Sequence, residues 1–313
     1  MTAVNITLEG GLCNKLFCLF SACDIAIKNK TKIIEPVFGW ERKILFSEIY
    51  DIRFFNKVMK EFNDGEELIV PHASRSKYKI KQNEQDLWLY SESVLRTQRD
   101  SNQIKRDCMM IVVLSSLKLN KRNLQLCNDV PDIESKCAMH IRIEQDWVKY
   151  AKGKMKKSKP PSRGIRPRAS GLAKQSSRPP STQVKELYLI NTDSLIDLYK
   201  KKGFEEDVFF TTGQNQSQVQ EQMLDNNIKS SYIFIHDLEY EINAAINFEL
   251  CCRAKRFIGL SRSTFSNLIS LRRALLDKNN SYIYNLNHQL CMRVDKGLHP
   301  CPKRATCNKV DFV

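Results

Sequence analysis

Long apolar runs are missing from this chain of 313 residues. No stretch approaches the length of about 20 apolar residues that a helix needs to cross a bilayer. The N-terminus also lacks the basic start and apolar core of a signal peptide. These absences argue against a membrane span and against secretion, so we expect a soluble, cytoplasmic protein. Its content of 42% hydrophobic and 27% charged residues is ordinary for a globular chain with a buried core.

Cysteine spacings typical of a disulfide framework are missing as well. The eleven cysteines are an odd number, and most stand within apolar stretches. We therefore expect buried free thiols. A late group, Cys291, His299, Cys301 and Cys307, could hold zinc, or two of its cysteines could pair in an oxidising compartment. It lacks the C-x₂₋₄-C pairs of structural zinc sites, which argues against a metal there.

Acidic residues are absent from residues 152–178, which hold ten lysines and arginines and so carry ten of the fifteen net positive charges. With its prolines and few apolar residues, the surrounding segment 149–184 is predicted to be a disordered insertion. It could be a solvated loop, a lid for an acidic acceptor or a nucleotide sugar, or a patch for nucleic acid or an anionic membrane. Without aromatic residues for base stacking, only weak, salt-sensitive contact with nucleic acid is expected.

Short β-like runs alternate with helical ones on both sides of this insertion, which predicts an α/β fold of parallel sheets covered by helices. The expected division is an N-terminal half at 1–148, the insertion at 149–184 and a C-terminal half at 185–313. The expected strands are 4–8, 32–37, 67–71, 137–143, 207–212, 231–235, 256–259 and 281–285. The expected helices are 13–28, 104–118, 192–202, 216–226, 241–253 and 264–277.

A hydroxyl-rich turn follows the predicted strand 256–259. Free backbone N–H groups at the start of the next helix, together with the hydroxyls of Ser261, Ser263, Thr264 and Ser266, suit a diphosphate. An ordinary helix N-cap has the same composition, so this turn does not identify a phosphate site alone.

Two adjacent glycines follow the first predicted strand. Gly10 and Gly11 permit positive φ and close approach of a ligand to the backbone, and Asn14 stands where its amide can face that ligand. The strand 207–212 ends in a similar turn, where Thr211 or Gly213 could contribute to the same site. The glycine pair alone is weak evidence, and for the turn after 207–212 a plain strand-to-helix turn is an equally good interpretation.

Polar and apolar residues alternate at the end of the predicted strand 137–143, so that His140, Arg142 and Glu144 share one face. A planar guanidinium suits a diphosphate because it donates two parallel, permanently charged hydrogen bonds. A half-buried edge strand would show the same alternation. All three motifs nevertheless lie at carboxyl ends of predicted parallel strands, where α/β sheets bind ligands.

Together the three segments resemble, in order and spacing, the motifs of the fucosyltransferase superfamily that contains the protein O-fucosyltransferases and the α-1,6- and α-1,2-fucosyltransferases. That family has an early Gly-Gly-x-x-Asn turn, a central His-x-Arg-x-x-x-Asp segment and a late Ser-Thr-Phe-Ser turn. The resemblance implies a GT-B-like fold, in which two Rossmann-like halves face each other across a cleft.

The resemblance also implies roles in binding a nucleotide-sugar donor. Arg142 would bind the β-phosphate and stabilise the leaving diphosphate, and His140 would lie near the ribose. Ser263 and Thr264 would hold the phosphates, and Phe265 would flank the base. Gly10, Gly11 and Asn14 would line the cleft where donor and acceptor meet.

The general base stays open, since Glu144, Asp146 and Glu9 could each accept the acceptor's proton; we favour Asp146 or Glu9. A carboxylate beside an arginine can also be a plain ion-pair partner. One departure concerns Asn247, which stands where the family often has an aspartate. If that aspartate reads the base, guanine specificity is in doubt here, because an amide can donate where a carboxylate only accepts.

The predicted function is a metal-independent glycosyltransferase that moves fucose or a related sugar from a nucleoside diphosphate, GDP-fucose first among the donors, to a hydroxyl of a glycan or protein, with inversion. Arg142 and the hydroxyl turn would replace a divalent cation, and the chain has no Asp-x-Asp motif. No cofactor is expected. Rhamnose or xylose on GDP or UDP fits as well. The alternatives are a catalytically silent sugar-nucleotide binder and a nucleic-acid-associated protein that uses the basic insertion.

Overall fold

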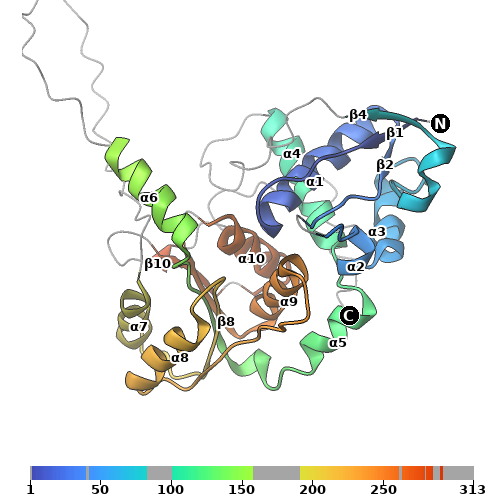
Figure 1. The fold of residues 1–313 in the computed structure, drawn as a ribbon. Coiled ribbons are helices and arrows are strands. Elements are labelled where there is room, and N and C mark those ends of the chain that lie inside the picture. Colours follow the sequence, from blue (N-terminus) through green and yellow to red (C-terminus); the bar gives the residue numbers. More distant parts are fainter. Residues whose placement is uncertain are drawn as a thin grey trace, which may run out of the picture.

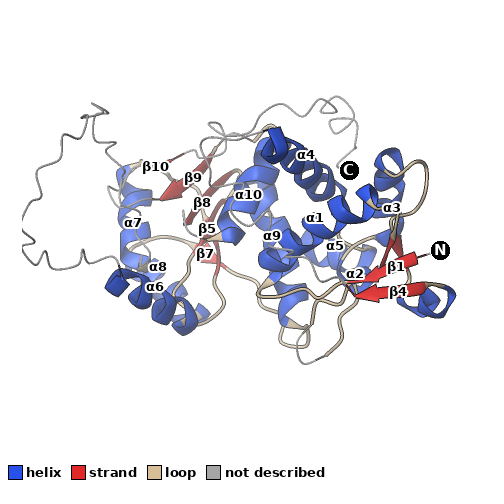
Figure 2. Ribbon diagram, turned by 90° about the horizontal axis from the view of Figure 1, so that it is seen from above, coloured by secondary structure: helices blue, strands red, loops and turns tan. Residues whose placement is uncertain are grey.

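The computed structural model describes residues 2–39, 42–82, 101–157, 191–260, 263–278, 280–284 and 290–291. These residues form two sheets separated by a layer of helices (Figures 1 and 2). The first sheet has the order β3-β2-β1-β4 and is parallel throughout. Its strands are β1 (Thr2–Asn5), β2 (Lys32–Ile34), β3 (Ile69–Val70) and β4 (Lys79–Gln82).

The second sheet has the order β10-β9-β8-β5-β6-β7, and only β10 runs antiparallel to its neighbour. Its strands are β5 (Cys137–His140), β6 (Val208–Thr211), β7 (Ser230–Ser231), β8 (Arg256–Leu260), β9 (Ser281–Tyr284) and β10 (Leu290–Cys291). The predicted parallel α/β architecture is therefore confirmed for the described residues.

The sheets divide the chain earlier than the predicted boundary at residue 148. Strand β5, expected as the end of the N-terminal half, pairs with β6 on one side and with β8 on the other. Ala138 lies opposite both Phe209 and Phe257 in this register. The strand that carries His140 is thus an inner strand of the second sheet, and this part of the expected division is corrected.

The helices between the sheets are α1 (Leu12–Lys28), α4 (Ser101–Ser116), α9 (Tyr240–Arg253) and α10 (Thr264–Leu275). Helices α7 (Thr192–Lys201) and α8 (Gln216–Asp225) cover the other face of the second sheet. Four helices were not predicted from the sequence: α2 (Phe46–Ile49), α3 (Ile52–Met59), α5 (Lys121–Asn128) and α6 (Gln145–Lys157). The 3₁₀ turns η1 (Lys60–Phe62), η2 (His72–Lys77) and η5 (Ile133–Ser135) were not predicted either.

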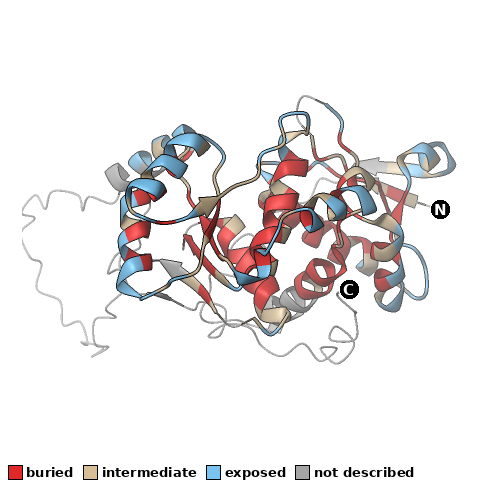
Figure 3. Ribbon diagram, turned by 90° about the horizontal axis from the view of Figure 1, so that it is seen from below, coloured by how far each residue is buried: buried red, intermediate tan, exposed pale blue. Residues whose placement is uncertain are grey.

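One continuous apolar core joins the two sheets through the helical layer (Figure 3). It includes Ile33 and Ile69 from the first sheet and Phe209 and Phe257 from the second. Helix α1 lies at its centre, and 13 of its 17 residues are buried. Such a helix, apolar on nearly all sides, is stable only when other elements surround it.

The predicted disorder from residue 149 onward is wrong at its start, because α6 continues through Lys157. The helix begins beside the pocket described below, where Trp147 is buried and stacks on Tyr150 with ring centroids 5.4 Å apart. This anchored first turn fixes where the helix begins, and lysine, a good helix former, allows it to continue. Residues 158–190, which contain most of the predicted insertion, lie outside the described residues.

Candidate functional site

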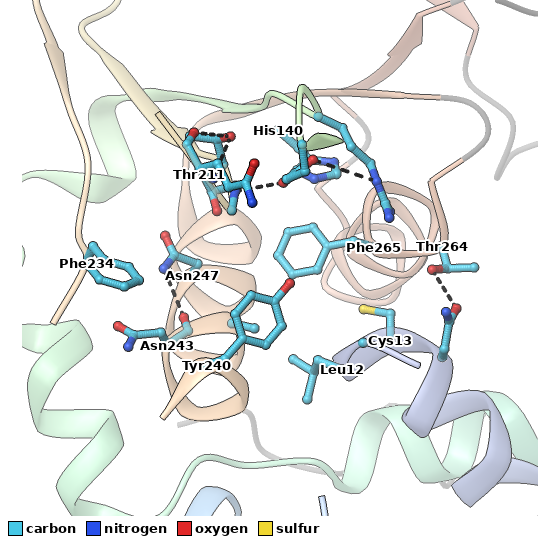
Figure 4. Close-up of a pocket in the computed structure, with 18 residues that line it drawn as sticks. Leu12, Cys13, His140, Thr211, Phe234, Tyr240, Asn243, Asn247, Thr264 and Phe265 are labelled. Carbon is cyan, nitrogen blue, oxygen red and sulfur yellow. Dashed lines mark hydrogen bonds and ion pairs between the residues drawn. The ribbon is translucent and has the colours of Figure 1, made fainter. Parts of the chain in front are cut away.

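A pocket of about 300 Å³ lies at the carboxyl ends of β5 and β6, between the starts of α1 and α10 (Figure 4). The loop before α9 and the first turns of that helix close its other side. The start of α1, which follows the first sheet's β1, and the strand ends of the second sheet therefore line one pocket. Its position agrees with the rule that open parallel sheets bind ligands beyond the carboxyl ends of their strands.

Two helix N-termini converge on this pocket. Helix α1 starts directly after Gly11 without a side-chain cap, and Gly11 and Asn14 both line the hollow. Helix α10 starts at Thr264, whose hydroxyl donates to Asn14 Oδ1 at 3.0 Å. The first N–H groups of a helix lack intrahelical partners and carry partial positive charge, so the paired helix starts favour an anionic group.

The glycine turn before α1 depends on backbone geometry as well as on space. Gly10 has a φ of +77°, which side-chain-bearing residues rarely adopt. A Cβ atom there would also stand 2.7 Å from Asn14 Nδ2. Gly10 thus shapes the turn that places Gly11 and Asn14 at the pocket.

His140 is buried at the end of β5, and its Nδ1 shares a hydrogen bond of 2.7 Å with Ser266 Oγ. That hydroxyl also accepts from the backbone N–H of Leu260 at 2.9 Å. Burial, and to a smaller extent the charge of Arg142, lowers the pKa of His140 to about 3. Its imidazole is therefore neutral at ordinary pH, and it packs against the ring of Phe265 with centroids 4.9 Å apart.

Arg142 supplies the positive charge of the pocket. Its guanidinium carbon lies 4.5 Å from the centroid of the Trp147 ring, and its Nε lies 3.9 Å from Glu144 Oε2. The other carboxylate oxygen of Glu144 accepts from the N–H of Gly213 at 2.7 Å. The arginine is therefore held between an aromatic face and a carboxylate beside two helix starts.

The opposite wall carries aromatic and amide groups. Phe234 and Tyr240 are exposed; the Tyr240 hydroxyl points toward the ring of Phe265, and Phe234 stands farther from it (Figure 4). Asn247 donates its amide N–H groups to the carbonyls of Asn243 and Ile233, at 2.9 and 3.3 Å. Its donors are thus engaged by the backbone, and its buried Oδ1 has no hydrogen-bond partner among the described residues.

The structure brings together six of the predicted site residues, contributed by all three motifs. They are Gly11, Asn14, His140, Arg142, Thr264 and Phe265. Thr211 and Gly213, considered as contributors to the nucleotide site, line the same pocket.

Other predicted residues lie elsewhere. Ser263, expected to hold phosphate, is fully buried, and its hydroxyl caps α10 by accepting from Ser266 N–H at 3.4 Å. Glu9 is exposed and does not line the pocket, and Gly10 shapes the turn without lining it. Asp146 lies in the first turn of α6, but its side chain, like all of Ser261, falls outside the described residues.

Several residues that line the pocket were not predicted from the sequence. Phe234 and Tyr240 flank a loop that Asn243 holds in place, donating to the carbonyls of Ile235 and Leu238 at 2.9 Å each. The sequence signal for this loop was an asparagine in the first turn of a predicted helix, after two aromatic residues. The prediction of a strand over 231–235 concealed the loop, because β7 in fact ends at Ser231.

The described cysteines match the prediction of buried free thiols. Seven of them are buried and unpaired, and burial raises the pKa of Cys127 and Cys137 to about 12. Within the described ranges, no three His, Cys, Asp or Glu residues form a group that could hold a metal ion. The late group that includes His299, Cys301 and Cys307 lies outside those ranges. In the same part of the chain, no helix combines the length and apolarity needed to span a membrane.

No protein-family model and no curated protein matches this chain in sequence. Solved structures are similar in fold. POFUT1 in complex with GDP superposes with a TM-score of 0.56 at 11% identity, covering 90% of this chain and 97% of that one. NodZ α-1,6-fucosyltransferase soaked with GDP-fucose has a TM-score of 0.53 at 13% identity, covering 93% of this chain and 98% of that one. The fucosyltransferase NodZ from Bradyrhizobium has a TM-score of 0.52 at 13% identity, with the same coverage. The predicted resemblance is thus confirmed in the fold, and the chain has the α/β fold of these fucosyltransferases.

Proposed function

We propose that this chain is a glycosyltransferase that moves fucose or a related sugar from a nucleoside diphosphate donor, GDP-fucose first, to a hydroxyl acceptor. The observation that carries the proposal is the pocket where Arg142 and the starts of α1 and α10 converge. It lies in a chain with the fold of proteins whose structures hold GDP or GDP-fucose. A GT-B arrangement, with the pocket in the cleft between two Rossmann-like halves, is part of the proposal.

The diphosphate of the donor would lie against the two helix starts, whose first backbone N–H groups favour an anion. The hydroxyl of Thr264 would turn from Asn14 Oδ1 toward the phosphate. Arg142 would bind the terminal phosphate with its planar fork. The base and ribose would extend toward the aromatic rings of Phe265, Phe234 and Tyr240. Asn247, whose donors are engaged by the backbone, would meet the base as an acceptor only if its side chain shifts, because its Oδ1 is buried.

In the proposed step, the acceptor hydroxyl oxygen bonds to the anomeric carbon from the face opposite the diphosphate. The bond from that carbon to the phosphate oxygen breaks, and its electron pair leaves with GDP. The hydroxyl proton passes to a carboxylate. Of the two predicted bases, Asp146 follows the motif that carries Arg142, whereas Glu9 does not line the pocket. Arg142 and the helix starts would stabilise the charge that develops on the phosphate without a divalent cation. His140, uncharged because its pKa is about 3, would act as a neutral hydrogen-bonding group.

Release of GDP or UDP from a panel of nucleotide sugars, with and without acceptors, tests the function. Arg142→Lys and Arg142→Ala should lower turnover by about 3–4 kcal/mol of transition-state stabilisation, while the fold stays intact. A matched control is Arg256→Lys, because the Arg256 guanidinium also lies 4.5 Å from an aromatic ring, that of Phe204, away from the pocket. Near wild-type turnover in Arg142→Lys would contradict the assignment.

A second candidate is a catalytically silent sugar-nucleotide binder. One observation favours it: among the described residues, the sole carboxylate that lines the pocket is Glu144, and both of its oxygens face other groups of the protein. Both candidates should bind GDP in calorimetry. The donor panel separates them, because the silent binder releases no GDP or UDP from any nucleotide sugar.

A further inference from the structure

Glu144 connects the two loops that follow the neighbouring strands β5 and β6. It stands four residues beyond His140, and its Oε1 accepts from the N–H of Gly213 at 2.7 Å. Its Oε2 lies 3.9 Å from Arg142 Nε. The side chain is 17% exposed, and Oε2 is buried without a hydrogen-bond partner among the described residues. One carboxylate therefore links the β6 loop to the arginine of the β5 loop.

Gly213 is shaped to receive this carboxylate. A Cβ atom at Gly213 would stand 2.7 Å from Glu144 Oε1 and 3.1 Å from its Cγ. A larger residue would push the carboxylate away from its present place, because the end of a glutamate side chain moves more easily than backbone. Gly213 and Glu144 thus fit each other, and the fit fixes where the negative charge stands.

That charge acts on Arg142. The Trp147 ring lies against the guanidinium at 4.5 Å, and the Glu144 carboxylate faces its Nε edge. The ring restricts the plane of the fork, and the carboxylate restricts its rotation within that plane. An arginine oriented beforehand loses less conformational entropy when it binds a ligand.

We propose that Glu144 is a positioning residue that orients Arg142 toward the terminal phosphate of the donor, and that it is not the general base. This inference rests on the proposed function. Protonation of Glu144 would remove the charge that faces Arg142 at the moment when the leaving phosphate needs the arginine. The chemistry of the acceptor proton therefore belongs to another carboxylate.

Affinities for GDP and GMP, measured by calorimetry, separate this role from general structural damage. Glu144→Ala should weaken GDP binding by about tenfold to a hundredfold, because a misplacement near 1 Å can cost that much. GMP, which lacks the terminal phosphate, should bind as tightly as to the wild type. Glu144→Gln keeps an acceptor for the Gly213 N–H but loses the charge, so it should lose GDP affinity without losing stability. Unchanged GDP affinity in both variants would overturn the inference.

The pH dependence of turnover provides an independent measurement. A general base gives the kcat profile an acidic limb that disappears when the base is replaced. In Glu144→Gln the limb should persist at reduced kcat. Its disappearance would show that Glu144 is the base itself.

Gly213→Ala tests the link without altering the carboxylate. In the wild-type background it should lower GDP affinity to the level of Glu144→Ala, because the new methyl group displaces Oε1. In the Glu144→Ala background the methyl group has room, so the second substitution should have no further effect. Gly153→Ala is the control, since nothing lies within 4 Å of a Cβ at that glycine. Additive losses in the double variant would mean that the methyl group acts directly on the ligand and would overturn the inference. If the wild type itself binds no GDP, the proposed function fails first; if it binds GDP and the variants do likewise, only the inference fails.

Discussion

The buried histidine of the pocket should make the protein sensitive to mild acid. His140 is only 6% exposed, and its pKa is lowered to about 3, chiefly by burial and also by the charge of Arg142. In the unfolded chain a histidine titrates near its ordinary pKa of about 6.5. Between these two pKa values the unfolded chain binds a proton that the folded protein does not. The free energy of unfolding must therefore decrease as the pH falls through this window.

The size of the effect follows from the width of the window. Each pH unit below the unfolded pKa costs about 1.4 kcal/mol, so the loss between about pH 7.5 and 5 is about 2 kcal/mol from this one group. Carboxylates whose pKa is lowered by ion pairing, such as Glu249, lose their stabilising effect at lower pH. The interval above pH 5 therefore reports mainly on histidine.

Urea unfolding of wild type and His140→Asn across this interval measures the effect. Asparagine keeps a polar atom near the position of Nδ1, which can reach Ser266 Oγ, but it does not titrate. The wild type should lose about 2 kcal/mol more than the variant between about pH 7.5 and 5. His72→Asn, at the start of η2, serves as the control and should keep the wild-type slope. Parallel curves for wild type and His140→Asn would mean that the folded protein binds this proton normally, which would refute the reasoning.

Three further outcomes are expected. Lys15→Met should lower the free energy of unfolding by about 3–5 kcal/mol, because it leaves Glu241 buried without the ammonium that now lies 2.6 Å away. Adding Glu241→Leu should recover most of this loss in the same urea assay, and no recovery would show that the ion pair is not the cause. Thr264→Val removes the hydroxyl that donates to Asn14 and should weaken GDP binding by about 1–2 kcal/mol in calorimetry, with unchanged affinity returning the turn to the status of an ordinary cap. Deletion of residues 158–178, which contain no aromatic side chain, should leave the free energy of unfolding and the rate of donor hydrolysis unchanged. If the segment is a lid, its deletion should instead raise the KM for an acidic acceptor alone. Loss of GDP binding in a folded variant would place part of the segment in the site.

The positions of the pocket residues were predictable because turns carry local chemistry. A glycine pair after a strand, a polar alternation at a strand end and a hydroxyl cluster before a helix are each recognised within about ten residues. The carboxyl-end rule then predicts that such turns meet, and Gly11, Arg142 and Thr264 do line one pocket. The different roles of the two neighbouring hydroxyls could not be predicted. Ser263 caps α10, whereas Thr264 donates to Asn14.

What could not be predicted depends on contacts between distant segments. The pairing of β5 with β6 and β8 is set by strand order, and nothing local assigned the strand to the second sheet. The start of α6 depends on the packing of Trp147, which the charge and proline content of the segment does not reveal. The Glu144 contact to Gly213 joins residues 69 apart, so its geometry becomes visible only in three dimensions.

The continuous core that surrounds α1 limits how the two halves can be exchanged between proteins. Helix α1 follows the first strand of the N-terminal sheet, but its first turn reaches α10 through Asn14 and α9 through Lys15. A chimera that joined the C-terminal half of this chain to the N-terminal half of a relative would separate α1 from both partners and bury a mismatched surface at the centre of the molecule. Residues that line the pocket are therefore better transplanted as individual loops than as halves. By the same reasoning, neither half should accumulate as a folded fragment when it is expressed alone.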